Sequence, residues 1–300
     1  MATKVRLKPD TTKRGSLKPD TARKGRLKPD TTKRRIVLKL GGELLEQPAD
    51  VARVAGAIAA LSRRAALVVV HGGGKEIDAA LALAGIPKRQ VDGLRVTDAP
   101  TLDIVISVLA GAINTRLVAA IRKAGGTAVG LTAADAAVAT MKRAAQIVSV
   151  SGERVNLGLV GAPAGSDRPQ LLIDLLARGY VPVIACIGAT KTGDLLNVNA
   201  DTLASHLATA LGASRLVIAG GTPGVLDDAG QTIARLTSKD AAALIRAGTA
   251  NKGMVAKLQA CRAAVQGGVG DVVIANGRQA RLDALGSAGA RLTGCTQVVR

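Results

Sequence analysis

Apolar runs, glycines and amphipathic segments alternate along most of this chain. The first two apolar runs, "RIVLKL" (35–40) and "ALVVV" (66–70), have the length of buried strands and are each closed by glycines. Each is followed by apolar positions at helical spacing, in residues 49–64 and 75–85. Because strand, glycines and helix recur in this order, the pattern predicts parallel βαβ units in a sheet that is covered on both faces.

The same alternation continues to the C-terminus. No Pro/Gly/Ser-rich linker interrupts residues 36–300, so we expect two lobes that share one sheet. Further helices are predicted at 101–126 and 200–213, and further strands at 127–131, 181–188, 215–221 and 271–277.

Residues 1–35 differ from the rest. They contain a tandem decapeptide, "RLKPDTTKRG" (6–15), "SLKPDTARKG" (16–25) and "RLKPDTTKRR" (26–35). Each unit has one Leu and no other large apolar residue, so burial cannot offset the entropy of ordering the backbone, and we expect disorder. This tail carries 13 Lys/Arg and 3 Asp, about half of the net charge of +19. A basic arm for nucleic acid is the functional alternative. The tail lacks aromatic residues for base stacking. We therefore favour the interpretation that it is a dispensable extension, and we expect no nucleic-acid partner.

Composition narrows the class of protein. The chain is 48% hydrophobic but has no Phe or Trp and one Tyr, so its core must be built from Ala, Val, Leu and Ile. Apolar runs such as 65–70 are too short to cross a bilayer, and no signal segment follows the first Met; we expect no membrane partner and a cytoplasmic location. Cys186, Cys261 and Cys295 are widely spaced without a C-x-x-C pair, which favours buried thiols over disulfides or a protein metal site.

The two glycine loops, 38–45 and 68–77, are the first candidates for chemistry. Glycines between a strand and a helix let the backbone approach a ligand and leave helix N–H groups directed at an anion. Ligands of open α/β sheets bind outside the carboxyl ends of the strands, so two adjacent loops predict two anions held together. The second loop is not a P-loop, because Glu76 follows Lys75 where that motif needs Ser or Thr.

Lys39 is unusual because it stands in the middle of an apolar strand. An unpaired ammonium is costly to bury. The bland interpretation is a lysine that reaches solvent from an edge strand. The functional one, which we favour, is a fixed cation that meets a phosphoryl group.

Five blocks in order, "IVLKLGGELL", "VVVHGGGKEID", "VDGLRVTD" (91–98), "GDLLNVNAD" (193–201) and "NKGMVAKLQAC" (251–261), resemble the acetylglutamate kinases of the amino-acid-kinase family. The resemblance runs from about residue 36 to the C-terminus. It implies a three-layer α/β/α sandwich with an open, mainly parallel sheet. Residues 36–185 would bind N-acetyl-L-glutamate and form the dimer, and residues 186–300 would bind ATP. The implied reaction is phosphorylation of the substrate's side-chain carboxylate by MgATP, the second step of arginine biosynthesis.

The resemblance also implies roles for individual side chains. Lys39 and Lys257 would stabilise the transferring phosphoryl group from opposite sides, and Asp201 would orient both lysines. Arg95 would hold the substrate's α-carboxylate, and Asn197 would also bind the substrate. A carboxylate nucleophile carries no proton at neutral pH, so no general base is expected.

Backbone groups complete the implied site. Gly41 and Gly42 would donate N–H groups to the γ-phosphate, and Gly72 and Gly73 to the reacting end of the substrate. The nucleotide would hold Mg²⁺, with no protein metal site.

The nucleotide loop, residues 217–230, departs from the family pattern. Gly220 and Gly221 stand where relatives usually carry Asp, so we expect nucleotide contacts from the loop backbone instead. The candidate residues are Thr222, Gly224 and Leu226.

The chain termini bear on assembly and regulation. The Pro-containing tail cannot form the N-terminal helix of arginine-inhibited hexamers, and residues 291–300 share only part of their arginine-site pattern. We therefore expect a homodimer through the helix 101–123, without strong arginine feedback.

Three alternatives remain at this point. One is a kinase for N-acetyl-2-aminoadipate of lysine biosynthesis. This acid is one methylene longer than N-acetyl-L-glutamate, and a binding pocket can discriminate a single methylene by only ~1–3 kcal/mol. Another is a catalytically weak regulatory relative, although Lys39, Asp201 and Lys257 together argue against it. The last is a nucleic-acid binder acting through the tail.

Overall fold

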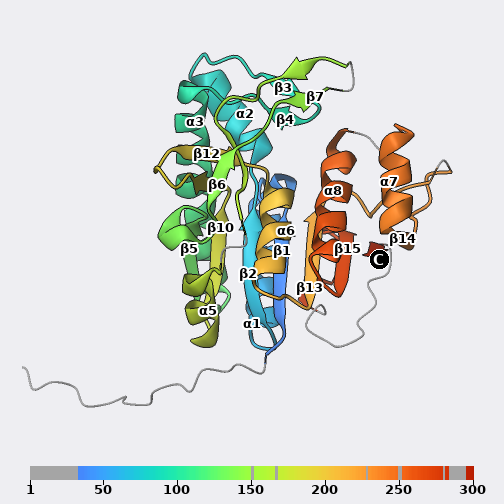
Figure 1. Cartoon of the computed structure of the whole chain (residues 1–300). Helices are drawn as coiled ribbons and strands as arrows, with labels where there is room; N and C mark the ends of the chain where they lie inside the picture. The colour runs from blue at the N-terminus through green and yellow to red at the C-terminus, as the bar shows by residue number, and fades with distance from the viewer. Residues whose placement is uncertain are drawn as a thin grey trace, which may run out of the picture.

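The computed structural model describes residues 33–149, 152–165, 168–227, 229–248, 252–279, 281–283 and 295–300. Nearly all of the decapeptide tail therefore lies outside the described residues, as does part of the segment 291–300, and the expectations for them stay predictions. The described chain contains one eight-stranded sheet, one four-stranded sheet and two small hairpins (Figure 1).

The large sheet is mainly parallel, as the sequence pattern predicts. Antiparallel pairing occurs between β15 and β16, whereas β1 pairs in parallel with both β2 and β13. From one edge to the other, the strands are β14 (Arg235–Thr237), β16 (Cys295–Val299), β15 (Asp271–Asn276), β13 (Arg215–Gly220), β1 (Arg35–Leu40), β2 (Ala66–His71), β10 (Val181–Ala185) and β5 (Ala128–Thr132).

Helices cover both faces of this sheet, which confirms the three-layer α/β/α class. On one face α1 and α4 contact each other and pack on β2, β5 and β10. On the other, α6 and α8 contact each other and pack on β1, β13, β15 and β16 (Figure 1). The helices outside the long helix described below are α1 (Pro48–Ser62), α2 (Gly74–Leu83), α5 (Gln170–Ala177), α6 (Ala200–Ala210), α7 (Ser238–Arg246) and α8 (Lys252–Gln266), with 3-10 turns η1 (Gly42–Leu44) and η3 (Asp135–Ala137).

Small aliphatic side chains build the core, because no Phe, Tyr or Trp ring is buried among the described residues. Every residue of β1 after Arg35 is buried, as is every residue of β2 after Ala66. Strands covered on both faces read as continuous apolar runs, which is why the sequence marked both of them correctly. Each fully buried Leu, Ile or Val contributes roughly 1.5–3 kcal/mol, so the core suffices without large rings.

The run 181–188 is not the single strand that the sequence predicts. Strand β10 ends at Ala185, and Ile187 opens β11 in the smaller sheet. Both parts are buried, so hydrophobicity alone cannot show where the chain turns. The smaller elements are β11 (Ile187–Ala189), β12 (Leu195–Val198), β9 (Val160–Pro163) and β6 (Met141–Arg143), with the hairpins β3 (Gln90–Val91)–β4 (Leu94–Arg95) and β7 (Ile147–Val148)–β8 (Arg154–Val155).

The long helix predicted at 101–126 spans three segments, α3 (Ala99–Ile106), a π-helical η2 (Ser107–Ile113) and α4 (Asn114–Lys123). It begins where Asp98 accepts a hydrogen bond from the N–H of Thr101, a typical N-cap. Of the described helices it alone is long and apolar enough to cross a membrane, by length and composition. It packs on α1, β5 and β10, as a helix covering a sheet does.

Candidate active site

The two glycine loops meet at the carboxyl ends of β1 and β2. A Cβ added to Gly42 would lie 2.9 Å from Cα of Gly73 and 3.0 Å from N of Gly74. The loops are therefore packed backbone to backbone, and only glycine fits at residue 42. Their local structures differ, since Gly74 opens α2 directly, whereas the first loop continues as the short turn η1 and α1 begins only at Pro48. The expectation that each glycine loop leads directly into an α-helix is therefore wrong for the first loop.

The glycine N–H groups divide into two kinds. Gly41 donates to the carbonyl of Ala219 at 2.8 Å, and Gly72 to the carbonyl of Leu40 at 3.1 Å. These two bonds extend the strand ladders, so these N–H groups are engaged in this conformation. In the described part of the chain, the N–H groups of Gly42 and Gly73 have no backbone or side-chain acceptor. Of these four glycines, Gly42 and Gly73 therefore carry the donors that are left for a ligand.

Lys39, Asp201 and Lys257 come together from three elements. The Nζ of Lys39 lies 2.8 Å from Oδ1 of Asp201, and the Nζ of Lys257 lies 4.0 Å from Oδ2. Lys39 sits on β1, which is flanked by β2 and β13, so the edge-strand interpretation of this lysine is wrong. One buried carboxylate thus lies between two ammonium groups.

Lys39 stays charged despite its burial. Burial by itself lowers the pKa of an amine, but the charge of Asp201, aided by Glu43, more than offsets it and holds the pKa of Lys39 above its usual value. The sequence placed this cation in the core, and the carboxylate that permits it comes from α6, 162 residues later. A buried, paired and permanently charged lysine is suited to stabilising phosphoryl charge.

Local sequence explains the position of Asp201. The side chain of Asn199 accepts hydrogen bonds from the N–H groups of Asp201 and Thr202, so it caps α6. Asp201 therefore falls in the first turn, where the helix dipole favours a carboxylate. Asn199 was not among the sequence-derived site residues. An Asn directly before a helical run is the signal that identifies such a cap.

Arg95 and Asn197 line a second pocket beside the lysines. Arg95 is buried on β4, where its Nη2 forms an ion pair with Asp78 and donates to the carbonyl of Gly74 at 3.3 Å. Its Nη1 is buried and has no hydrogen-bond partner among the described residues. The amide of Asn197 on β12 donates to Oγ1 of Thr97, which donates to the carbonyl of Arg95. Gly72, Gly73 and Ala200 complete one side of this pocket.

His71 is a structural member of the site rather than a ligand. Its Nε2 accepts from the amide of Asn114 at 3.1 Å, so the neutral ring carries its proton on Nδ1, which faces the carbonyl of Gly72 at 3.2 Å. The same amide donates to the carbonyl of Val183. Neutral His71 therefore ties the second glycine loop to the long helix and to β10. Asn114 carries no sequence signal for this role, because it lies 43 residues away.

Burial lowers the pKa of His71 to about 4, far below its usual 6.5. Between these values the unfolded chain binds a proton that the folded chain does not, so stability falls as the pH falls from about 6.5 to about 4. We expect this group to remove about 3 kcal/mol of unfolding free energy over that range. His71→Asn should flatten the dependence, measured by urea unfolding at a series of pH values. Equal slopes for both proteins would contradict the assignment.

The nucleotide-loop residues lie beyond the end of β13. Thr222 and Leu226 are exposed, whereas Gly224 is buried against Thr296 of β16, whose Oγ1 accepts the N–H of Val225 at 2.7 Å. The N–H of Gly221 is also engaged, by the carboxylate of Glu43 at 2.7 Å. Two of the loop's backbone donors are therefore already occupied. No sequence pattern points to the roles of Glu43 and Thr296, since both contacts join distant segments.

The thiols stand apart from this chemistry. Cys186 and Cys261 are buried and Cys295 is partly exposed, and no disulfide joins them. Burial raises the pKa of Cys186 to about 12, so this thiol is protonated at neutral pH. It donates to the carbonyl of His71, which makes it a packing residue at the edge of the pocket that Arg95 and Asn197 line.

A lysine pair braced by one aspartate, next to two packed glycine loops, is a candidate phosphoryl-transfer site. Comparison with known proteins shows to which family the chain belongs. Residues 34–276 match the model of the amino acid kinase family. The chain belongs to the amino acid kinase family. An acetylglutamate kinase of Sorangium cellulosum is 44% identical, over 78% of this chain and 84% of that protein. One of Methanopyrus kandleri is 41% identical, over 80% of this chain and 94% of that protein.

Solved structures agree with the family assignment. An N-acetylglutamate synthase of Neisseria gonorrhoeae, complexed with coenzyme A and N-acetyl-glutamate, superposes with a TM-score of 0.73 at 25% identity, over 89% of this chain and 59% of that chain. A carbamate kinase of Giardia lamblia, bound to citric acid, superposes with a TM-score of 0.62 at 14% identity, over 89% of this chain and 99% of that chain. At this identity, the second likeness shows the shared fold alone.

Proposed function

We propose that this amino acid kinase phosphorylates the side-chain carboxylate of N-acetyl-L-glutamate with ATP, the second step of arginine biosynthesis. The observation that carries the proposal is the pair of lysines on one buried aspartate, next to a pocket with an unpartnered arginine nitrogen. The acetylglutamate kinases that match over most of the chain support the choice of substrate.

The residues suit an in-line transfer. A carboxylate oxygen of the substrate attacks the γ-phosphorus while the bond to the β–γ bridging oxygen breaks, and ADP leaves. Lys39 and Lys257 neutralise the charge on the transferring group, and Asp201 keeps both ammonium groups oriented. The free N–H groups of Gly42 and Gly73 are directed at oxygens of the same centre. Because the attacking carboxylate is already ionised, the reaction needs no general base.

The second pocket orients the substrate. The free Nη1 of Arg95 is placed for an α-carboxylate, while Asp78 fixes the rest of the guanidinium. Asn197, fixed through Thr97, is placed for the amide of the acetyl group. A buried donor left unpaired costs about 1–3 kcal/mol, so the pocket favours a ligand with an acceptor at this point.

We place Mg²⁺ on the phosphates of the nucleotide. Among the described residues, no group of three or more His, Cys, Asp or Glu side chains is arranged to hold a metal ion. Thr222, Gly224 and Leu226 remain our proposed nucleotide contacts, whereas the N–H groups of Gly41 and Gly72 are already engaged in the strand ladders. The assignment of residues 36–185 to the substrate and 186–300 to ATP is part of the same proposal.

We also propose a cytoplasmic homodimer. The face of the long helix that includes Gly111, Ala112 and Thr115 is exposed, and only 33% of its most apolar stretch is buried within one chain. Beside it lies β5, an edge strand of the large sheet whose outer side has no strand partner among the described residues. A second copy would cover both features.

The proposed reaction is tested by trapping its product. With MgATP and N-acetyl-L-glutamate, the full chain should form an acyl phosphate that hydroxylamine captures as a hydroxamate. N-acetyl-L-glutamine is the matched control, because it keeps the α-carboxylate and acetyl group but lacks the carboxylate that accepts the phosphoryl group. Absence of hydroxamate with N-acetyl-L-glutamate, or an equal signal with both compounds, would refute the proposal.

A further inference from the structure

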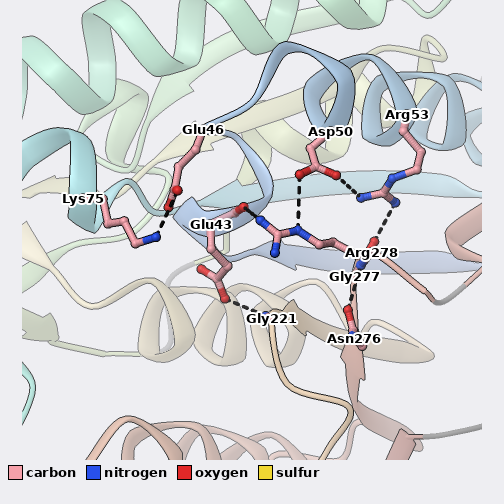
Figure 2. Close-up of polar contacts among 9 residues, drawn as sticks. All are labelled: Glu43, Glu46, Asp50, Arg53, Lys75, Gly221, Asn276, Gly277 and Arg278. Carbon is pink, nitrogen blue, oxygen red and sulfur yellow. Dashed lines mark hydrogen bonds and ion pairs between the residues drawn. The ribbon is translucent and has the colours of Figure 1, made fainter.

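Glu43 folds its side chain back over the carboxyl ends of β1 and β13. Its Oε1 accepts the N–H of Gly221 at 2.7 Å (Figure 2). A Cβ added to Gly41 would lie 2.3 Å from Oε2 of Glu43, and one added to Gly220 would lie 3.0 Å from Oε1. The carboxylate therefore rests directly on glycine backbone, at the edge of the sheet where ligands of α/β proteins bind.

The surroundings of this carboxylate are cationic. Lys39 senses its charge, which is one reason that the lysine's pKa is raised. The Cε of Lys257 approaches the same point, 3.8 Å from a Cβ built on Gly220. Among the described residues no ion pair within 4.0 Å fixes the carboxylate of Glu43, which is held by a backbone N–H instead. A backbone donor close to cationic side chains is a setting that suits a phosphate.

Because an anion already stands in this setting, we propose that the Glu43 carboxylate takes the place of a nucleotide phosphate before the nucleotide binds and must leave when ATP binds. The inference rests on the proposed function, since it takes the ligand to be a nucleotide. Glu43 is half-buried and its side chain is flexible, so rotation about its own bonds frees Gly221. Glu43 thereby sets the affinity for ATP, and it balances the charge of the two lysines when no nucleotide is present.

The turn that carries Glu43 is braced from the opposite side. Nη2 of Arg278 donates to the backbone carbonyl of Glu43 at 3.0 Å, and its Nε donates to Asp50 at 3.2 Å. Asp50 also pairs with Arg53, whose Nη1 donates to the carbonyl of Gly277 at 2.7 Å (Figure 2). The segment after β15 is thus tied to η1 and α1. Arg278 fixes the backbone of Glu43 but does not bind its carboxylate. Arg278 is therefore a positioning residue.

Calorimetric titration of the full chain with the ATP analogue AMP-PNP, without acetylglutamate, tests the proposal. Glu43→Ala should tighten AMP-PNP binding about tenfold, since the analogue no longer displaces a charged hydrogen-bonded group. Glu43→Gln, which keeps the shape, should change affinity in the same direction by less. Glu46→Gln is the matched control, because this nearby carboxylate pairs with Lys75 outside the site, and its affinity should equal that of the wild type. Circular dichroism verifies that each variant is folded.

Titrations with and without Mg²⁺ separate the alternatives. The gain in affinity should appear in both conditions. Weaker binding only in the presence of Mg²⁺ would make Glu43 a metal ligand and overturn the proposal, as would unchanged affinity or no AMP-PNP binding by any variant. Arg278→Ala as a single substitution should tighten AMP-PNP binding. Added to Glu43→Ala, it should not change the affinity further. These titrations contain no acetylglutamate, so they remain informative even where the kinase assay fails.

Discussion

Replacing Lys39 by Ala should lower kcat by about 10³-fold with little change in KM for either substrate. The lysine is buried, charged and 2.8 Å from Asp201, so its ammonium is preorganised for the transition state. Its removal also leaves Asp201 with the more distant Lys257 as its remaining cationic partner. Steady-state kinetics by a coupled ADP assay would measure the effect, and circular dichroism would show that the sheet persists.

Lys75→Ala provides the matched control for this experiment. Lys75 belongs to the "HGGGK" stretch that resembles a phosphate loop, but its side chain is 75% exposed and pairs with Glu46. An exposed pair of this kind is worth at most about 1 kcal/mol. We expect near-normal kcat for Lys75→Ala. Near-normal turnover for Lys39→Ala instead would overturn the proposed mechanism.

Gly42→Ala should lower kcat/KM by about 10²-fold or more, although it adds a single methyl group. The new Cβ would lie within 3.1 Å of three backbone atoms of Gly73 and Gly74, which cannot rotate away as a side chain can. The two loops must therefore separate, and the donors of Gly42 and Gly73 lose their shared alignment. Overpacking of this kind also costs about 1–3 kcal/mol of stability, measurable by urea unfolding.

Gly56→Ala is the control for the added methyl group. Gly56 lies on the exposed side of α1, and a Cβ there would meet no atom within 4 Å. In a helix interior this change should raise stability by about 0.4–1 kcal/mol and leave kinetics unchanged. Equal activity of Gly42→Ala and Gly56→Ala would show that contact between the loops is unimportant for catalysis.

The two lysines of the site differ in how firmly their side chains are held. Lys39 is fixed on a central strand, whereas Lys257 projects from α8 and stays 4.0 Å from Asp201, with part of its side chain exposed. The charge of Glu43 helps to raise the pKa of Lys39, and its Oε1 and the Cε of Lys257 approach the same point at Gly220. Nucleotide phosphates that replace this carboxylate would bring more negative charge to the same place. We expect Lys257, whose side chain is partly exposed, to approach the phosphoryl group at that stage.

Local patterns of the sequence determined much of the fold. Strand β1 matches its predicted bounds and α2 differs by one or two residues at each end, because periodicity and glycines are read within short windows. The buried Lys39 was recognisable because a charge within an apolar run is rare. The break after Ala185 could not be recognised, since both neighbouring strands are buried and look alike in sequence.

The contacts that complete the site were decided by tertiary structure alone. Glu43 reaches Gly221 across 178 residues, and Arg278 reaches Glu43 across 235. Hydrophobic periodicity carries no information about which polar groups meet when distant segments pack, because their pairing depends on strand order and register. The sequence by itself therefore determined the kinds of elements and the presence of a buried cation. Only the packed sheet decided which carboxylate balances that cation and which carboxylate lies over the glycines beside it.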